Sequence, residues 1–182
     1  PAVSWEDPLA GAPPHFSRRD RVADLEGYCR IVNVGRYSVV SLPDPARINF
    51  NPEALYAKLR DSERCYALCG FDYSELWYGE GARELDLAEQ VDEYWRFGAD
   101  GLKLWTGKPS FQRELGIDLR HRAFRDAFAI AASRRFPVVI HIADPPEFWE
   151  GRLGGINADL GISYEDPGTP GFEELLSQAE HV

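Results

Sequence analysis

The stretch Pro137-Val138-Val139-Ile140-His141-Ile142-Ala143 constrains the fold of this 182-residue chain more than any other. Its residues are apolar and mostly β-branched, which predicts a buried strand, and the Asp144-Pro145-Pro146 that follows predicts a turn. Three earlier runs of the same kind span residues 37–42, 65–71 and 101–105. Helical patterns separate the four runs. This alternation predicts an α/β fold with a parallel sheet, either an open doubly wound sheet or an eight-stranded barrel.

Five helical segments flank the expected strands. They are predicted over residues 18–32, from Asn51, over 85–97, from Asp118 as N-cap, and from Thr169-Pro170 to about Glu180. Two apolar stripes at helical spacing are predicted to face the core: Leu87, Val91 and Trp95 in one helix, and Phe124, Ala127, Phe128 and Ala131 in the next. No G-x-G-x-x-G or P-loop motif follows a strand, so neither phosphate-binding motif favours the open sheet.

Composition is that of an ordinary globular domain, with 44% apolar and 27% charged residues and a formal net charge of −10. The acidic balance, without a Lys/Arg-rich run, predicts no nucleic-acid partner. No run approaches about 18 consecutive apolar residues, so we expect no membrane partner. Cys65 and Cys69 would lie about 13 Å apart in one strand, too far for a disulfide, which favours a reduced, cytoplasmic protein.

The carboxyl ends of the strands are where parallel α/β folds place their chemistry. Alternation along a strand puts His141 on the face opposite Val138, Ile140 and Ile142, and it puts Lys103 and Trp105 together on one face of the 101–105 run. A lone histidine of this kind is more often a hydrogen-bonded core residue, and a lysine there is solvated if its strand is an edge strand. Because both residues are expected to face one axis, the pair favours a functional site.

Further acidic residues lie close to strand ends. Asp44 and Asp72 sit in turn-like sequence, where aspartate is typically a turn former. Asp144 lies close to His141 but also precedes two prolines. The segment 144–168 is long, rich in glycine and carries aromatic residues, which predicts a lid over the strand ends.

Residues 97–104, Phe-Gly-Ala-Asp-Gly-Leu-Lys-Leu, followed by the 137–145 stretch and Phe148-Trp149, resemble the amidohydrolase superfamily. The resemblance is to its amidohydrolase-related branch of metal-dependent hydrolases and decarboxylases. Residues 170–176 are similar to the segment that these proteins carry before their sixth strand. The resemblance covers about residues 20–182 and implies a partial (β/α)8 TIM-type barrel, of which this chain supplies roughly strands 2 to 5 with their helices.

The resemblance also implies a chemistry. A divalent metal, most commonly zinc, activates water for attack on an amide, lactone or related carbonyl of a small-molecule substrate, or supports a decarboxylation. His141 matches the metal-ligand histidine of the fifth strand. Lys103 stands where binuclear members carry a carboxylated lysine; it would bridge two metals or bind a substrate carboxylate as a cation. Asp144 or a backbone carbonyl is expected to orient His141, and Trp105 and Trp149 are expected to shape the substrate pocket.

The chain also departs from the family pattern. It has no His-x-His pair for the first strand, and the histidine of the sixth strand and the aspartate of the eighth would lie beyond Val182. We therefore expect residues 1–182 to be a single, truncated barrel domain with a loop-like segment over 1–20, inactive by itself. The sequence does not decide the identity of the substrate, the number of metal ions, or the choice between hydrolysis and decarboxylation. It also does not decide whether the protein is a homo-oligomer.

Three other readings of the sequence remain. An open-sheet hydrolase would need a nucleophile, yet no G-x-S-x-G elbow is present. A carbohydrate-active barrel would need paired carboxylates, yet no acid falls within a strand on the inward face. A non-catalytic half-barrel that binds or assembles with a partner needs neither feature.

Overall fold

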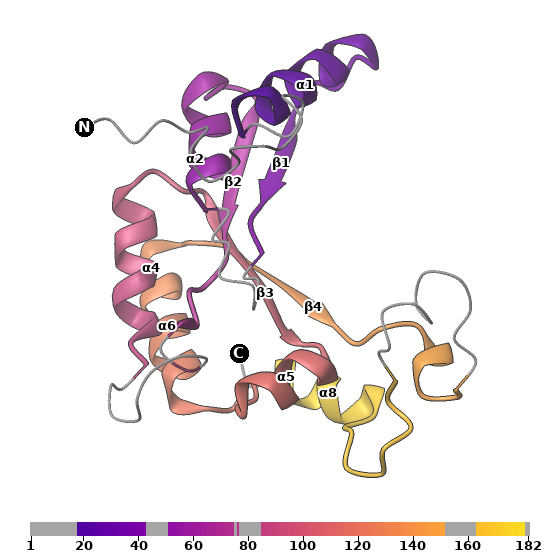
Figure 1. Cartoon of the computed structure of the whole chain (residues 1–182). Coiled ribbons are helices and arrows are strands. Elements are labelled where there is room, and N and C mark those ends of the chain that lie inside the picture. The colour runs from indigo at the N-terminus through magenta and orange to yellow at the C-terminus, as the bar shows by residue number, and fades with distance from the viewer. Residues whose placement is uncertain (1–17, 43–50, 75, 77–84, 152–162, 181–182) are drawn as a thin grey trace.

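The computed structural model describes residues 18–42, 51–74, 76, 85–151 and 163–180 (Figure 1). Four strands alternate with helices along the chain. The elements are α1 (Arg18–Ile31), β1 (Tyr37–Val40), α2 (Asn51–Arg60), β2 (Cys65–Cys69), α4 (Leu87–Arg96), β3 (Gly101–Gly107), α5 (Pro109–Leu115), α6 (Arg122–Arg134), β4 (Val138–Ile142), the 3-10 helix η3 (Pro146–Phe148) and α8 (Phe172–Ala179).

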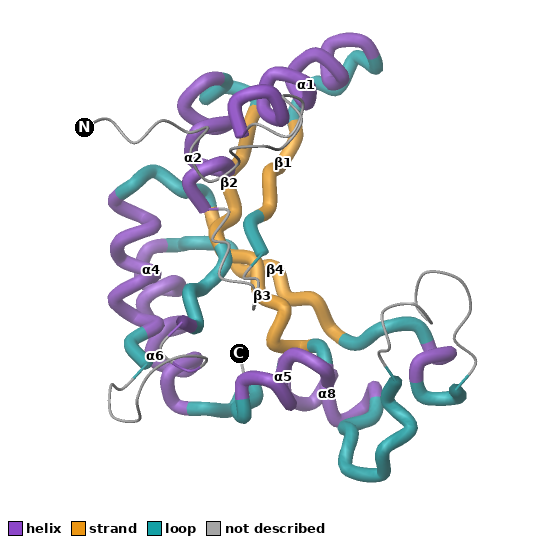
Figure 2. The backbone as a smooth tube through the Cα atoms, in the orientation of Figure 1, coloured by secondary structure: helices purple, strands orange, loops and turns teal. Residues whose placement is uncertain are grey.

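All four strands belong to one parallel sheet in the order β1-β2-β3-β4. Figure 2 shows the sheet curling, with α4 and α6 beside one of its faces. The β3–β4 register shifts between Leu104 and Gly107, where β3 carries one residue more than β4. The predicted α/β class and parallel sheet are confirmed.

Among the described residues, helices cover one face of the sheet and leave the other face uncovered. On the covered face, Leu102 and Leu104 are 0% and 1% exposed and pack with Phe124 in the main core. Burial on this scale contributes about 1.5–3 kcal/mol for each large apolar side chain. On the opposite face, Val40 and Val139 each remain 44% exposed. The predicted alternation is therefore confirmed, and β3 and β4 turn Lys103, Trp105 and His141 toward the uncovered face.

Two helical predictions are wrong in detail. Tyr94, not Trp95, completes the buried stripe of α4, and Trp95 is 44% exposed beneath the guanidinium of Arg134, 4.4 Å from its ring centroid. At 3.6 residues per turn, position i+7 stays closer to the stripe than position i+8. The N-cap of α6 is His121, whose Nδ1 accepts from Ala123 N, whereas Asp118 accepts from the backbone and guanidinium of Arg120.

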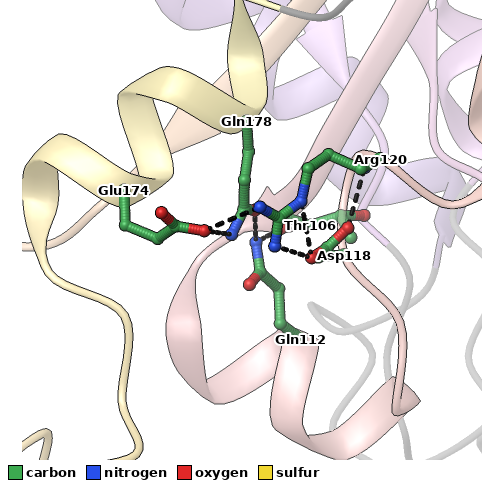
Figure 3. Close-up of polar contacts among 6 residues, drawn as sticks. All are labelled: Thr106, Gln112, Asp118, Arg120, Glu174 and Gln178. Carbon is green, nitrogen blue, oxygen red and sulfur yellow. Dashed lines mark hydrogen bonds and ion pairs between the residues drawn. The ribbon is translucent and has the colours of Figure 1, made fainter.

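Helix α8 is attached to the carboxyl end of the sheet by a polar network (Figure 3). The buried Gln112 amide donates to Thr106 O and to Gln178 Oε1, each at 2.6 Å. At the surface, Arg120 lies 2.9 Å from Glu174 Oε1. Because buried amides need partners, this network fixes α8 against the end of β3.

The expectation that Cys65 and Cys69 do not pair is confirmed, because both thiols are free and buried. Within the described ranges, no helix is both long and apolar enough to cross a bilayer.

Candidate functional site

Asp144 lies at the centre of a polar cluster beyond the carboxyl ends of β3 and β4. Its Oδ1 is 3.2 Å from Lys108 Nζ and 3.4 Å from His141 Nε2. Its Oδ2 accepts a hydrogen bond from the hydroxyl of Tyr164, which lies 3.1 Å from Ser110 Oγ. The Asp144 side chain is only 7% exposed, whereas the imidazole of His141 is 36% exposed. The cluster thus places a buried carboxylate behind an accessible imidazole.

The charge state of this cluster follows from its contacts. Burial by itself raises the pKa of Asp144, but hydrogen bonds from His141 and Tyr164 and the positive charge of Lys108 outweigh it, and the pKa of the carboxyl lies below its ordinary value. Burial and the bond to Asp144 raise the pKa of Tyr164 to about 12. At neutral pH Asp144 is therefore an ionised acceptor and Tyr164 a protonated donor.

The backbone between His141 and Asp144 is unusual. Ala143 has a φ of 61°, in the left-handed region, which costs a residue with a Cβ about 1–2 kcal/mol. Its N–H donates to Gly107 O at 3.0 Å. At Gly107, an added Cβ would overlap His141 O and lie 3.0 Å from His141 C. The close approach of β3 and β4 therefore requires glycine at position 107. The left-handed backbone at Ala143 turns the chain so that Asp144 faces the imidazole of His141.

Trp105 covers one side of the cluster. Its ring centroid is 6.1 Å from that of His141, and Lys108 Nζ lies 5.1 Å from the Trp105 ring centroid. An ammonium over an indole face is an attractive cation–π arrangement. Lys108 is the N-cap residue of α5, and Pro109 follows it at the first helical position. The structure thus joins Trp105, His141 and Asp144, three of the residues expected from the sequence, in one cluster.

Lys103 lies on the same face of the sheet but outside this cluster. Among the described residues it makes no hydrogen bond or ion pair, and burial lowers the pKa of its amine. An ammonium that is partly desolvated and has no anionic partner is a favourable place for a negative group to bind.

Trp149 contacts the cluster through Tyr164. Its indole Nε1 donates to Pro170 O at 3.3 Å, and its ring packs 4.8 Å from that of Tyr164. It supports Tyr164, and its expected contact with substrate stays a prediction. Asp72 is an exposed turn residue that accepts from Ser74 N, as expected for a turn former. Asp44, the segment 1–17 and residues 152–162 of the expected lid lie outside the described residues.

Sequence reasoning did not identify Lys108, Tyr164 and Ser110 as site residues. One signal was present for Lys108, because the Pro109 after it marks a helix start at a strand end. No local signal marks Tyr164, since it lies 20 residues from Asp144 in the chain.

Among the described residues, the set of donor side chains around His141 is too small for a zinc centre. A metal-bound histidine usually donates its other ring N–H to a carboxylate, and His141 and Asp144 are arranged in this way. A catalytic zinc also needs about three protein ligands. The described part of the chain contains no group of three His, Cys, Asp or Glu side chains that could hold a metal. Within the described ranges, His141 therefore stands as a single candidate ligand.

A surface cavity of about 400 Å³ lies between α5 and residues 166–170. None of the residues of the Asp144 cluster lines it, and the acids among its described lining residues are Asp118 and Asp166. No protein-family model, no curated protein and no solved structure matches this chain.

Proposed function

We propose that this chain carries part of the active site of a metal-dependent hydrolase of the amidohydrolase type, on a partial (β/α)8 barrel. The observation that supports this most is His141. It is an accessible imidazole at the carboxyl end of a parallel strand, on the uncovered face of a curled sheet, with a buried carboxylate behind it. The resemblance of residues 97–104 and 137–145 to that superfamily supports the same function.

In this proposal, His141 would be one of the residues that hold the metal, with Asp144 behind its ring. When bound, a divalent metal such as zinc supplies an activated water and polarises the substrate carbonyl. Asp144 orients the imidazole, and although burial raises the pKa of that carboxyl, its contacts with His141, Tyr164 and Lys108 hold the pKa below its ordinary value. These contacts are what a histidine needs in order to present a fixed lone pair.

The substrate is a small molecule that enters over Trp105. Lys103 either bridges two metals as a carbamate or binds an anionic group of the substrate as a cation. Its desolvation and its lack of an anionic partner among the described residues fit both roles. We include a reducing, cytoplasmic location in the proposal, because all three cysteine thiols are free and buried.

A second candidate is a non-catalytic half-barrel that assembles with a partner. The observation that favours it is the uncovered face of the sheet, where Val40, Tyr66 and Val139 are 38–44% exposed. Parallel sheets are normally covered on both faces. This candidate predicts a stable dimer in sedimentation experiments and no zinc bound through His141.

Because residues 1–182 are expected to be inactive by themselves, zinc titration of a version of the chain that is extended at both termini tests the metal proposal. We expect His141→Ala to lower zinc affinity by at least about tenfold, since even the loss of a partner behind a ligand costs about 10–100-fold. The matched control is His121→Asn, which removes another imidazole of the described residues but keeps a good helix N-cap. Zinc affinity that is equal in the wild type and His141→Ala would contradict the proposal.

An activity panel on the same proteins tests the reaction class. Hydrolysis of amides and lactones is followed by proton release, and decarboxylation by release of CO2. We expect any zinc-dependent turnover to disappear in His141→Ala and to persist in His121→Asn. Release of CO2 without hydrolysis would support the decarboxylase alternative, and turnover that does not need His141 would contradict both.

A further inference from the structure

The surface cavity beside α5 is lined by a buried polar side chain, that of Gln112. The residue is only 8% exposed, and it lines the cavity of about 400 Å³. Its nitrogen Nε2 donates to Thr106 O and to Gln178 Oε1, so both protons of the amide are used inside the chain. We call this space the α5 cavity; its lining residues are 109, 112, 113, 116–118, 166 and 168–170.

The amide oxygen of Gln112 is the atom that remains for a ligand. The amide cannot be turned over, because its oxygen would then lie against the carbonyl oxygen of Thr106. Figure 3 shows the nitrogen of Gln112 directed at Gln178 and the oxygen turned away from it. Among the described residues, no group donates a hydrogen bond to this oxygen. A deeply buried amide normally has partners for both of its ends, so the oxygen is an acceptor for a donor from outside the chain.

Two side chains of opposite charge line the same cavity without pairing. Arg113 belongs to α5, and Asp166 lies in the segment that faces it. Within the described ranges, Arg113 makes no hydrogen bond or ion pair, and Asp166 makes no ion pair. Asp166 Oδ1 accepts from Gly168 N and its backbone O from Thr169 N, each at 2.9 Å, and these bonds fix the carboxylate at the cavity. Both charges are thus available to a ligand.

The rest of the lining is neutral or already paired. Asp118 accepts from Arg120 N at 2.8 Å through Oδ1, and from the guanidinium at 2.6 Å through Oδ2, so its charge is compensated within the chain. Pro109, Ile117 and Pro170 make an apolar wall. The described lining therefore combines an unpaired cation, an unpaired anion, an amide acceptor and an apolar surface.

We propose that the α5 cavity binds a small zwitterion of the α-amino acid class with an apolar side chain. Asp166 and Gln112 Oε1 receive the ammonium, and Arg113 receives the carboxylate. An ammonium only donates and a carboxylate only accepts, which matches these three groups. A volume of about 400 Å³ suits a small ligand, since ligand pockets measure about 300–1,000 Å³. The inference goes beyond the proposed function, because none of these residues belongs to the Asp144 cluster.

The test is a titration with L-leucine. The described residues form the cavity by themselves, so the 182-residue chain is the protein used. Binding is followed by the side-chain amide signals of Gln112 in a nitrogen–proton correlation spectrum, and we expect these signals to shift and to saturate. Two analogues separate the charges: L-leucinamide lacks the carboxylate, and N-acetyl-L-leucine lacks the ammonium. We expect each to bind about three- to fivefold more weakly than leucine, as for loss of one exposed ion pair.

Two variants assign the charges to residues. Arg113→Gln should weaken leucine about three- to fivefold and leave leucinamide unchanged, because leucinamide has no carboxylate for the arginine to bind. Asp166→Asn keeps an oxygen for Gly168 N; it should weaken leucine similarly and leave N-acetyl-leucine unchanged. Both side chains are exposed, so we expect both variants to fold. The matched controls are Arg125→Gln on α6 and Asp24→Asn on α1, exposed residues outside the cavity lining, and they should bind leucine as the wild type does.

Three results would overturn the inference. The first is a leucine titration without a saturable shift of the Gln112 amide signals. The second is leucinamide that binds as tightly as leucine, which indicates a site for a cation alone. The third is equal weakening of leucine and leucinamide in Arg113→Gln, which indicates that the arginine acts through the fold and not on the carboxylate. Because no zinc is added, failure here is distinct from failure of the metal proposal, which is judged by zinc affinity.

Discussion

Gly107→Ala is the substitution that the geometry of this site most clearly forbids. An added Cβ at position 107 would overlap His141 O and lie 3.0 Å from His141 C and 3.1 Å from Ile142 Cα. All three are backbone atoms of β4, which cannot rotate aside as a flexible side chain can. The strands would have to separate at the bond from Ala143 N to Gly107 O, which is 3.0 Å long in the native chain.

The cost can be worked out from these contacts. Overpacking a close-packed site costs about 1–3 kcal/mol, and a clash with backbone on three atoms belongs at the upper end of that range. With a urea m-value of about 2 kcal/mol/M, a loss of about 3 kcal/mol lowers the unfolding midpoint by about 1.5 M. Since the displaced carbonyl belongs to His141, we also expect faster hydrogen exchange at the amide of Ala143 and lower zinc affinity.

The assay is equilibrium unfolding in urea, followed by tryptophan fluorescence. Gly35→Ala is the matched control, because a Cβ at position 35 meets nothing within 4 Å and the backbone there is not left-handed. We expect this control to change stability by no more than about 0.5 kcal/mol. If Gly107→Ala were as stable as Gly35→Ala, the close approach of β3 and β4 at His141 would not hold and the reasoning would be refuted.

Two further predictions concern the residues between β4 and the cluster. Ala143 has a φ of 61°, so Ala143→Gly should be neutral or slightly stabilising. The β-branched variant Ala143→Val should destabilise the chain by more than about 1 kcal/mol. Equal effects of the two substitutions in urea unfolding would count against the left-handed backbone. Asp144→Asn should lower stability at neutral pH by about 1–3 kcal/mol, since it removes charge-assisted hydrogen bonds. The pKa of Asp144 is lowered by folding, so this stabilisation is complete above the unfolded pKa of about 3.9 and disappears as the pH falls through the folded value. A difference between wild type and variant that widens on acidification would refute the ion pair.

The assembly of strands and helices could be predicted from the sequence with few errors. Each strand is a local apolar run, and alternation along a strand is set by backbone geometry, so the shared face of Lys103, Trp105 and His141 followed from position alone. The error at Trp95 came from extending the stripe to position i+8, where i+7 lies closer to it. The error at Asp118 came from N-cap preference, which favours aspartate, whereas the helix begins after His121. Short α5 has too few residues for an apolar period to be recognised.

The environment of the imidazole was decided only by the tertiary structure. Lys108, Asp144 and Tyr164 come from three separate segments, and nothing within any one segment indicates the other two. The left-handed backbone at Ala143 and the close strand contact at Gly107 arise when β3 and β4 pair, because a one-residue register shift must be absorbed there. The strands are encoded by residues that are neighbours in the sequence, whereas the groups that surround His141 meet only once the sheet has formed.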